Sequence, residues 1–237
     1  MTNSTIIYLL ISNRESVDEF KESLALLRMN FLDDYPYPVT AFIENNFDDS
    51  WRSEILGIYE NVNFSKIKFS IPEFNLDLDI PEFFPHPTHG NGPVAWGHPG
   101  FSLGYRHMCR FMSGDIYRNA ELLKYDFYMR LDTDSYILSK LTIDPFQIMS
   151  DGNYNYGYNN TQKDNHKVVE NLFEVSEKYI AMHEINRKSS IEYPMIYYTN
   201  FEIGRVQWFI KSGYMDFFDH LDLIGGIYTK RWGDAPI

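Results

Sequence analysis

Cysteine, basic residues and long apolar runs are all scarce in this sequence, and each scarcity excludes something. Cys109 is the only cysteine among 237 residues, which rules out an intrachain disulfide and a cysteine-based zinc site. Lysine and arginine together number 21 against 33 aspartates and glutamates, giving a formal net charge of −12. A general nucleic-acid binder needs a basic surface, so we expect no nucleic-acid partner. Because no run of about 18 apolar residues occurs, the sequence also predicts no membrane span.

The first residues predict a core strand and no targeting segment. The opening MTNSTIIYLLIS has a short apolar run and no basic residue before it, whereas a signal peptide begins with a basic region. We therefore expect neither a signal nor an anchor in this chain, and the sequence leaves the cellular compartment open.

Strand and helix patterns alternate along the first third of the chain. Hydrophobic residues make up 44% of the sequence, which is enough for a substantial core. Buried-strand patterns at 5–12, 37–45 and 65–72 alternate with helical patterns at 14–31 and 49–59. This order is typical of an α/β sheet with parallel pairing, and no linker divides the chain clearly. The length and pattern suit one α/β domain or two small ones.

Further helices are predicted in the second half of the chain, including one or two short ones over 206–226. In IDPFQIMSDG, Asp144 is the expected N-cap, Pro145 fits the first turn and Gly152 follows the end. The residues 163–187 carry the longest amphipathic pattern, and we expect one helix there.

An irregular loop is predicted over residues 72–99, which are rich in proline and glycine. His86, His89 and His98 lie in it. Because their setting lacks the fixed spacing of metal ligands, we interpret them as solvated loop residues rather than as a metal cluster.

Two aspartates, Asp132 and Asp134, directly follow the apolar run 127–131. Ligands of open α/β sheets bind at the carboxyl ends of strands, and side chains at i and i+2 point the same way if the chain stays extended. Two such carboxylates can hold Mg²⁺ or Mn²⁺ while a diphosphate fills the remaining positions of the ion. An acid-x-acid triplet also arises by chance, as at 77–79, so a solvated turn is the alternative.

Five stretches of the sequence carry a resemblance to a known family. They are YRHMCRFMSG at 105–114, YDFYMRLDTD at 125–134, DPFQIM at 144–149, TNFEIG at 199–204 and YMDFFDHLDLIGGIYTKRWGDAPI at 214–237. In this order they resemble motifs of the fungal-type α-1,2-mannosyltransferases that use GDP-mannose, glycosyltransferase family 15. The family's Glu-Pro-Asp is replaced here by Asp-Thr-Asp, so the preference among metals is expected to shift.

The resemblance implies a fold, a reaction and a set of site residues. The implied fold is a GT-A-like single domain over residues 1–237, with a mixed, mostly parallel sheet flanked by helices. The implied reaction is metal-dependent transfer of mannose from GDP-mannose to a hydroxyl of a glycan or glycoprotein, with retention of configuration and with Mn²⁺ or Mg²⁺. Asp132 and Asp134 take the acid positions that bind metal and diphosphate, Tyr105 a donor-site position, and Glu202 the position of a glutamate against the anomeric carbon.

The residues around Glu202 are compatible with that role. The run before it predicts a second strand, whose end should approach the first. In a retaining transfer a carboxylate serves either as nucleophile or as stabiliser of an oxocarbenium-like centre, and both routes stay open. The structural alternative is a salt bridge between Glu202 and Arg205 or an acid at a helix start.

Three arginines are our own candidates for pairing with phosphate or carboxylate groups: Arg106, Arg110 and Arg130. Arg106 and Arg110 lie four residues apart in a predicted helix, so they share a face. Two surface arginines are the alternative to an anion-facing pair.

The resemblance leaves the metal site incomplete. Members of the family continue beyond a Gly-Asp-Ala-Pro run, here 233–236, and supply a later histidine ligand, so this chain is either truncated or completes the metal site differently. The family also implies the Golgi lumen. The rival functions are transfer from another nucleotide sugar, a non-catalytic carbohydrate-binding protein on a decayed transferase fold, and a metal-dependent phosphohydrolase.

Overall fold

The chain folds into two compact units. The computed structural model describes residues 1–84, 101–164, 166–186 and 195–237. Unit 1 comprises Met1–Lys68, Asn119–Asn159 and Thr199–Trp208, and unit 2 comprises Phe69–Arg118, Asn160–Tyr198 and Phe209–Ile237. His86, His89 and His98 lie outside the described residues, and the single domain over residues 1–237 stays a prediction.

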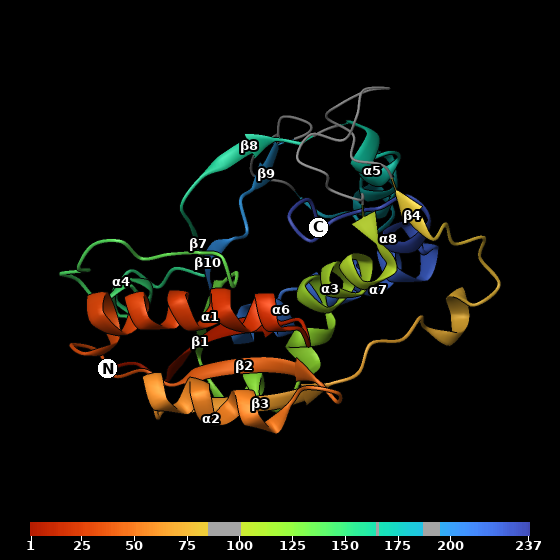
Figure 1. Cartoon of the computed structure of the whole chain (residues 1–237). Coiled ribbons are helices and arrows are strands. Elements are labelled where there is room, and N and C mark those ends of the chain that lie inside the picture. Colours follow the sequence, from red (N-terminus) through yellow and green to blue (C-terminus); the bar gives the residue numbers. More distant parts are fainter. Residues whose placement is uncertain (85–100, 165, 187–194) are drawn as a thin grey trace. The chain divides into compact units, whose positions relative to one another are not determined.

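Unit 1 is built on a six-stranded sheet with the order β3-β2-β1-β6-β10-β7 (Figure 1). The strands are β1 (Ser4–Leu10), β2 (Val39–Glu44), β3 (Val62–Ile67), β6 (Phe127–Leu131), β7 (Tyr156–Tyr158) and β10 (Phe201–Arg205). β1 pairs in parallel with β2 and β6, and β2 pairs in parallel with β3, whereas β10 is antiparallel to both β6 and β7. The predicted α/β class and the mixed, mostly parallel sheet are confirmed.

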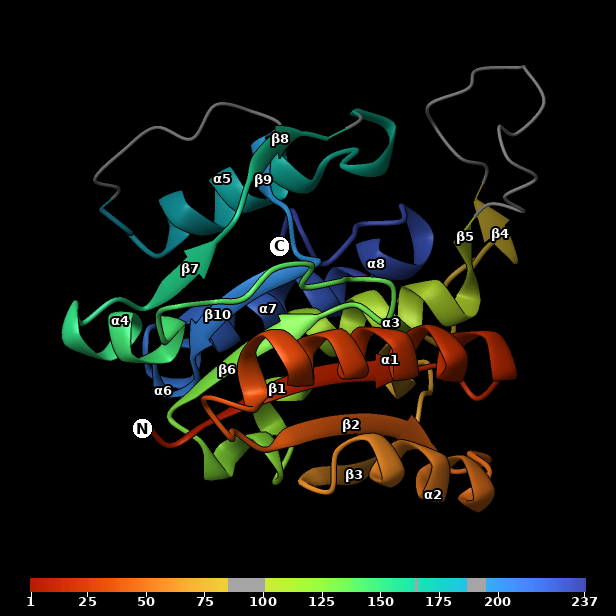
Figure 2. The ribbon, with the colours of Figure 1, turned by 60° about the vertical axis from the view of Figure 1, so that its left-hand side comes forward.

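One face of this sheet is covered by helices α1 (Arg14–Leu27) and α2 (Asp49–Ile58), which Figure 2 shows lying along the strands. Alternate residues of β1 point to this face, and Tyr8 packs edge-on against Phe20 of α1 at a ring distance of 4.7 Å. Leu24 and Leu27 are fully buried in the same cluster. Each such side chain contributes about 1.5–3 kcal/mol by leaving water, so this face carries the main core of unit 1.

The helix α4 (Pro145–Asp151) follows the sheet's β6 strand in the chain and was predicted correctly. Asp144 caps it by accepting hydrogen bonds from the backbone N–H groups of Phe146 and Gln147. Phe146 is fully buried in the core of unit 1. A side chain that caps N–H groups which have no helical partner typically stabilises a helix by about 1 kcal/mol.

Unit 2 is mainly helical among its described residues. Its helices are α3 (Leu103–Ser113), α5 (Leu172–Met182), α7 (Tyr214–Ile224) and α8 (Gly226–Thr229), and its short strand pairs are β4 (Phe83–Phe84) with β5 (Phe101–Ser102) and β8 (Thr161–Lys163) with β9 (Met195–Tyr197). Cys109, Phe218 and Trp232 form part of its buried core. A methyl group on Gly226 would lie 2.3 Å from the Trp232 ring, so the close packing of this ring requires glycine there.

Short helical segments complete the described chain. They are the π-helical turn Arg28–Leu32, the 3-10 turns Glu73–Asn75, Asp115–Arg118, Leu122–Lys124 and His166–Val168, and α6 (Val206–Lys211). No helix among the described residues is both long and apolar enough to span a bilayer.

Some predicted boundaries were wrong. The helix expected over 163–187 begins only at Leu172, because Asn171 adopts a left-handed backbone conformation with φ of 63°. The third strand begins at Val62 and ends at Ile67, earlier than expected. Helix α2 begins at Asp49, as the pattern predicted, and its N-cap is Asp48, whose side chain accepts the N–H of Ser50.

Candidate active site

The two aspartates lie on a tight turn rather than on an extended strand. Strand β6 ends at Leu131, and the N–H of Ser135 donates to the carbonyl oxygen of Asp132 at 3.0 Å. Asp134 is therefore inside the turn, and the condition for two parallel side chains at i and i+2 is not met. The Asp132 side chain is 41% exposed, and Asp134 is exposed as well. Both carboxylates are accessible to a ligand.

This turn is fixed by contacts from distant parts of the chain. Ser23 of α1 donates its hydroxyl to the carbonyl of Ser135 at 2.5 Å, and the Ser135 hydroxyl donates to the carbonyl of Asn200 at 3.2 Å. Thr133 donates its hydroxyl to Oε2 of Glu19 at 3.2 Å. Because these contacts order the backbone before any ligand arrives, less conformational entropy is lost when a ligand binds.

Arg130 stands directly beside the first aspartate. Its Nε and Nη2 atoms each lie 3.3 Å from Oδ1 of Asp132. The Arg130 side chain is 5% exposed, and Arg130 is the penultimate residue of strand β6. The guanidinium orients the carboxylate and offsets part of its charge.

Glu202 is buried in the middle of strand β10, next to β6. The register places it opposite Arg130, and residues directly opposite each other in an antiparallel pair point to the same face. Glu202 is 7% exposed. Tyr128 donates its hydroxyl to Oε1 at 3.0 Å, and Tyr156 of β7 donates to Oε2 at 2.5 Å. Each oxygen of this carboxylate is thus held by a different tyrosine.

Gly204 makes room for the first of these tyrosines. It lies opposite Tyr128 in the register, and a methyl group on it would lie 2.4 Å from Cε1 of the Tyr128 ring. The ring therefore crosses strand β10 over the glycine and brings its hydroxyl to Glu202. The close approach of this ring explains why the last residue of the TNFEIG stretch is glycine.

The salt bridge between Glu202 and Arg205, considered as a structural alternative, is not formed in the described structure. Arg205 instead lies over the ring of Phe127, with its Cζ 4.6 Å from the ring centroid, and donates to the carbonyl of Tyr154 and to Oδ1 of Asn153.

Unit 1 therefore brings four of the predicted site residues onto neighbouring positions of β6, its following turn and β10. Phe201 faces Leu131 in the register, so Glu202 lies one position inside the paired strands while Asp132 lies one position beyond them. Tyr128 and Tyr156 were not predicted as site residues from the sequence. The alternation of Tyr128 and Arg130 along one strand was a usable signal, but the pairing with Tyr156 required the register of β7.

The carboxylates of the turn fit a hard divalent cation in their chemistry but do not complete its coordination. Aspartate oxygens are the ligands that Mg²⁺ and Mn²⁺ prefer. Among the described residues, no group of three or more histidine, cysteine, aspartate or glutamate side chains is placed to hold a metal ion. The remaining ligands of such an ion would be supplied by water and by a bound phosphate group.

The other predicted residues, Tyr105, Arg106 and Arg110, belong to unit 2. Arg106 is fully buried and donates to the carbonyl oxygens of Tyr228 at 2.6 Å, of Glu82 at 3.0 Å and of Pro81. Burial lowers the pKa of this guanidinium. These contacts give Arg106 a structural role, and its contact with a donor stays a prediction.

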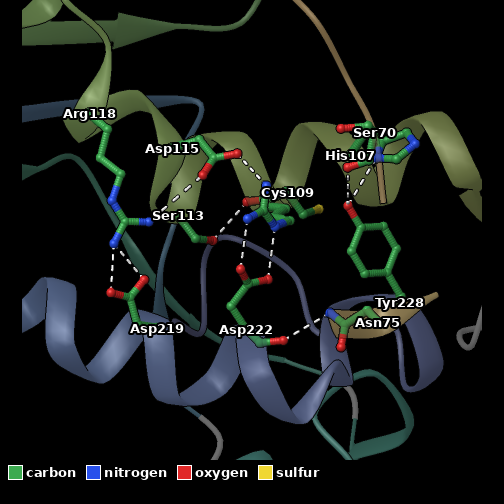
Figure 3. A network of polar contacts seen from close by, with 11 residues as sticks. Ser70, Asn75, His107, Cys109, Ser113, Asp115, Arg118, Asp219, Asp222 and Tyr228 are labelled. Carbon is green, nitrogen blue, oxygen red and sulfur yellow. Dashed lines mark hydrogen bonds and ion pairs between the residues drawn. The ribbon is translucent and has the colours of Figure 1, made fainter. Parts of the chain in front are cut away.

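Arg110 is paired with carboxylates of the chain itself. Its Nε and Nη2 atoms donate to the two oxygens of Asp222 at 2.8 and 2.7 Å, and Nη1 donates to Asp115. Figure 3 shows this network, in which the Asn75 side chain also donates to the carbonyl of Asp222. Arg110 shares a helix with Arg106, as predicted, but both point to partners within unit 2, and a donor role for Arg110 stays a prediction.

Tyr105 is partly buried and makes a polar contact of its own. Its hydroxyl oxygen accepts a hydrogen bond from Nη2 of Arg231 at 3.1 Å. Burial raises the pKa of this hydroxyl well above its ordinary value, so Tyr105 is neutral at physiological pH. Its predicted place in a donor site stays a prediction.

Comparison with known proteins identifies one matching family model. The model described as glycolipid 2-alpha-mannosyltransferase matches residues 1–237. The probable mannosyltransferase KTR3 of Saccharomyces cerevisiae is 35% identical over an aligned length of 150 residues, gaps included, and the match covers 58% of this chain and 37% of that protein. The O-glycoside alpha-1,2-mannosyltransferase omh1 of Schizosaccharomyces pombe is 26% identical over an aligned length of 254 residues, gaps included, and the match covers 97% of this chain and 62% of that protein. The chain thus spans less than two thirds of the length of these relatives.

A solved structure shares the fold. Core-mannan synthase A (CmsA/Ktr4) of Aspergillus fumigatus, crystallised in an Mn/GDP form, superposes with a TM-score of 0.81 at 21% identity, and the match covers 100% of this chain and 68% of that one. At this identity the likeness establishes the fold.

Proposed function

Because the chain belongs to the glycolipid 2-alpha-mannosyltransferase family, whose model matches residues 1–237, we propose that it is a mannosyltransferase. In this proposal it moves mannose from GDP-mannose to a hydroxyl group of a glycan or glycoprotein, needs a divalent metal ion and retains the anomeric configuration. Residues 1–237 form the catalytic domain in this view.

The observation that carries the proposal is the arrangement of carboxylates at the end of β6. Two accessible aspartates lie on a turn fixed by Ser135, and a buried glutamate lies on the neighbouring strand. Glu202 faces the same side of the sheet as Arg130, which contacts Asp132. A metal-dependent transfer with retention of configuration uses both features: negative groups that hold a cation for the leaving diphosphate, and a carboxylate near the carbon that becomes positive.

Asp132 and Asp134 are the residues that hold the metal ion in this proposal. The solved relative CmsA/Ktr4 carries Mn and GDP, and the two aspartates offer the hard oxygen ligands that such an ion takes. When bound, the ion offsets the negative charge that develops on the departing diphosphate. Arg130 keeps Asp132 oriented, because its guanidinium donates to Oδ1 of that carboxylate.

Glu202 supplies the negative charge beside the sugar. Its two oxygens are held by the hydroxyls of Tyr128 and Tyr156, and hydrogen bonds to a carboxylate favour its charged form. A fixed charge that needs no reorganisation stabilises a positively charged transition state most effectively. Hydrogen bonds on both oxygens also weaken a nucleophile, so the contacts favour electrostatic stabilisation over covalent attack.

The test of this proposal combines binding with turnover. GDP affinity is measured by calorimetry with and without Mn²⁺ for the wild-type chain and for Asp134→Ala, and transfer of labelled mannose from GDP-mannose to α-methylmannoside is measured in parallel. We expect Mn²⁺ to strengthen GDP binding in the wild type and not in Asp134→Ala. Asp77→Ala is the matched control, because Asp77 is an exposed acid of the other acid-x-acid triplet.

Two results would contradict the proposal. Equal GDP affinity with and without metal would remove the role of the aspartates, and binding of GDP without transfer or hydrolysis would favour a non-catalytic protein. A panel of nucleotide sugars, read by thermal shift, separates GDP-mannose from UDP-sugars and GDP-fucose, since a metal held on two carboxylates does not read the base.

A further inference from the structure

Tyr158 lies beside Glu202 on β7, the strand at one end of the six-stranded sheet. The register of β10 and β7 places Tyr158 directly opposite Glu202, and the register of β10 and β6 places Arg130 on the other side of Glu202. Residues directly opposite each other in an antiparallel pair point to the same face, with Cβ atoms about 4.5–5.5 Å apart. Arg130, Glu202 and Tyr158 therefore form one row across three strands of unit 1, which we call the cross-strand row.

The cross-strand row lies on the face of the sheet opposite to α1. Met129 and Ile203, the sequence neighbours of Arg130 and Glu202, belong to the core cluster to which α1 contributes. Because side chains alternate between the two faces along a strand, the members of the row point the other way. The core beneath α1 therefore does not account for the Tyr158 ring.

The ring of Tyr158 is accessible although its two partners in the row are buried. Tyr158 is 49% exposed, whereas Arg130 and Glu202 are both buried. The ring lies nearly parallel to that of Tyr156, with the centroids 6.3 Å apart and an angle of 28° between the planes. Tyr156 is itself fixed by its hydrogen bond to Glu202. The Tyr158 ring is thus oriented by a neighbour that belongs to the site and still reaches solvent.

The chemistry of the cross-strand row changes from one end to the other. At the β6 end, Arg130 contacts Asp132, which holds the metal ion and diphosphate in the proposed function. Glu202 in the middle is the carboxylate beside the sugar carbon, and an aromatic ring follows at the β7 end. Sites for small molecules combine aromatic surface with a few precisely placed polar groups. An exposed ring next to a fixed carboxylate has this composition, and a sugar can lay the C–H groups of one face on such a ring.

Tyr154 provides the comparison, because it is also an exposed tyrosine of unit 1. It is 55% exposed and precedes β7, so it does not belong to the row. Its ring packs on Gly152, where an added methyl group would overlap it. Single exposed aromatic residues are normal on protein surfaces and by themselves indicate no site. The position beside Glu202 is what sets Tyr158 apart.

We propose that Tyr158 is a stacking platform for the acceptor sugar, a pyranoside that lies against the exposed tyrosine ring beside Glu202. This inference rests on the proposed function, which places the diphosphate of the donor at the Asp132 end of the cross-strand row. The acceptor is therefore assigned to the β7 end. A platform for the sugar of the donor is the alternative outcome that the test separates.

The first test is steady-state kinetics of mannose transfer from GDP-mannose to α-methylmannoside in Mn²⁺, for the wild type, Tyr158→Ala, Tyr158→Phe and the matched control Tyr154→Ala. We expect Tyr158→Ala to raise the KM for α-methylmannoside about 3- to 10-fold, the range for losing one aromatic contact. The KM for GDP-mannose and the hydrolysis of GDP-mannose without acceptor should stay unchanged. Tyr158→Phe keeps the ring, so it should behave as the wild type, and Tyr154→Ala should do so as well.

Three kinetic results would overturn the platform. A higher KM for GDP-mannose in Tyr158→Ala would make the ring part of the donor site. An equal fall in transfer and in hydrolysis of GDP-mannose would make Tyr158 a support of Glu202. Wild-type constants for Tyr158→Ala would leave the ring without a role in acceptor binding.

A direct measurement covers the case in which Tyr158→Ala does not fold. The ring signals of Tyr158 are observed by ¹³C NMR in chain labelled at tyrosine, and they are assigned by their absence from Tyr158→Phe. α-Methylmannoside is added with Mg²⁺ and GDP, and mannitol, an open-chain polyol without a ring face, is the control ligand. A saturable shift with the mannoside and a much weaker one with mannitol supports the platform. An unchanged signal or an equal response to both overturns it.

The two proposals fail in different ways. If the chain transfers no mannose but the Tyr158 signals respond saturably to α-methylmannoside, the proposed function is wrong and the sugar-binding role of Tyr158 stands. If mannose is transferred and Tyr158→Ala keeps the wild-type KM for α-methylmannoside, the platform is wrong and the proposed function stands.

Discussion

Tyr156 donates its hydroxyl to Oε2 of Glu202 at 2.5 Å, from the strand β7 that borders β10. The other oxygen of Glu202 accepts from Tyr128 on the opposite side, in β6. Three neighbouring strands thus fix one buried carboxylate, and its orientation depends on side chains that need not touch a substrate. Tyr128 and Tyr156 are positioning residues in this arrangement.

Replacement of Tyr156 by phenylalanine is expected to lower kcat roughly 10- to 100-fold, the range for losing a hydrogen bond to a charged group. The KM for GDP-mannose should stay nearly unchanged, because the variant leaves Asp132 and Asp134 intact. Steady-state kinetics measures both constants. Tyr154→Phe is the matched control, since Tyr154 is 55% exposed. A rise in KM with unchanged kcat would show that Tyr156 binds the donor instead of positioning Glu202.

Replacement of Gly204 by alanine is expected to destabilise the chain by about 1–3 kcal/mol, because the new methyl group would lie 2.4 Å from the Tyr128 ring. The ring must move, so the hydrogen bond to Glu202 is lost and kcat falls as well. Urea unfolding measures the stability. Gly57→Ala in α2 is the control: no atom lies within 4 Å of its added methyl group, and helix propensity predicts a gain of about 0.5–1 kcal/mol. Equal effects of the two changes would refute the steric argument.

The sequence could predict the strands and the position of the acid pair, because both depend on local patterns. Buried runs identified β1, β2 and β6, and Asp144 and Pro145 identified the start of α4. Local capping chemistry and hydrophobic periodicity decide such features without knowledge of the rest of the fold.

The shape of the turn at Asp132 could not be predicted from the sequence. The chain direction there depends on Ser23, which lies 112 residues before Ser135, and on Asn200, which lies 65 residues after it. The condition of an extended chain at Asp132 and Asp134 is therefore not met, although their place after β6 was right. Interactions between distant residues overrode the simplest local expectation.

The arginines illustrate the same limit. The four-residue spacing of Arg106 and Arg110 predicted that they share a helix face. Their partners Tyr228 and Asp222, however, lie 122 and 112 residues away in the sequence. Arg231 was part of a motif used for recognition, yet its burial among rings is a property of the folded chain. Spacing alone does not identify the partners of an arginine.

The ion pair between Arg110 and Asp222 should be important for stability. Asp222 is 3% exposed and accepts two hydrogen bonds from the guanidinium, so Asp222→Ala leaves a partly buried cation with one partner fewer. We expect a loss of about 3–5 kcal/mol, measured by urea unfolding. The exposed pair of Arg118 and Asp219 gives the control, for which Asp219→Ala should cost at most about 1 kcal/mol. Losses of similar size in the two variants would contradict the difference in burial.

His107 should make the stability of the chain fall in mildly acidic solution. Burial, with the nearby charges of Arg106 and Arg110, lowers the pKa of its imidazole below the usual value of 6.5. The ring lies parallel to Phe69 at a centroid distance of 5.7 Å, and its Nδ1 is 3.0 Å from the Tyr228 hydroxyl. The unfolded chain therefore takes up a proton at a higher pH than the folded chain does.

Neutral His107 makes its full contribution to the free energy of unfolding at pH values above the pKa that His107 has in the unfolded chain, about 6.5. This contribution is lost as the pH falls from there toward the lower pKa that His107 has in the folded chain. Urea unfolding of the wild type between pH 7.5 and 5.5 should show this decline, and His107→Gln, which cannot titrate, should show a flatter dependence. His220→Gln is the control, because it removes a histidine from another helix, α7. If both variants kept the wild-type slope, the decline would come from other groups, and the lowering of the His107 pKa by burial and by Arg106 and Arg110 would be too small to matter.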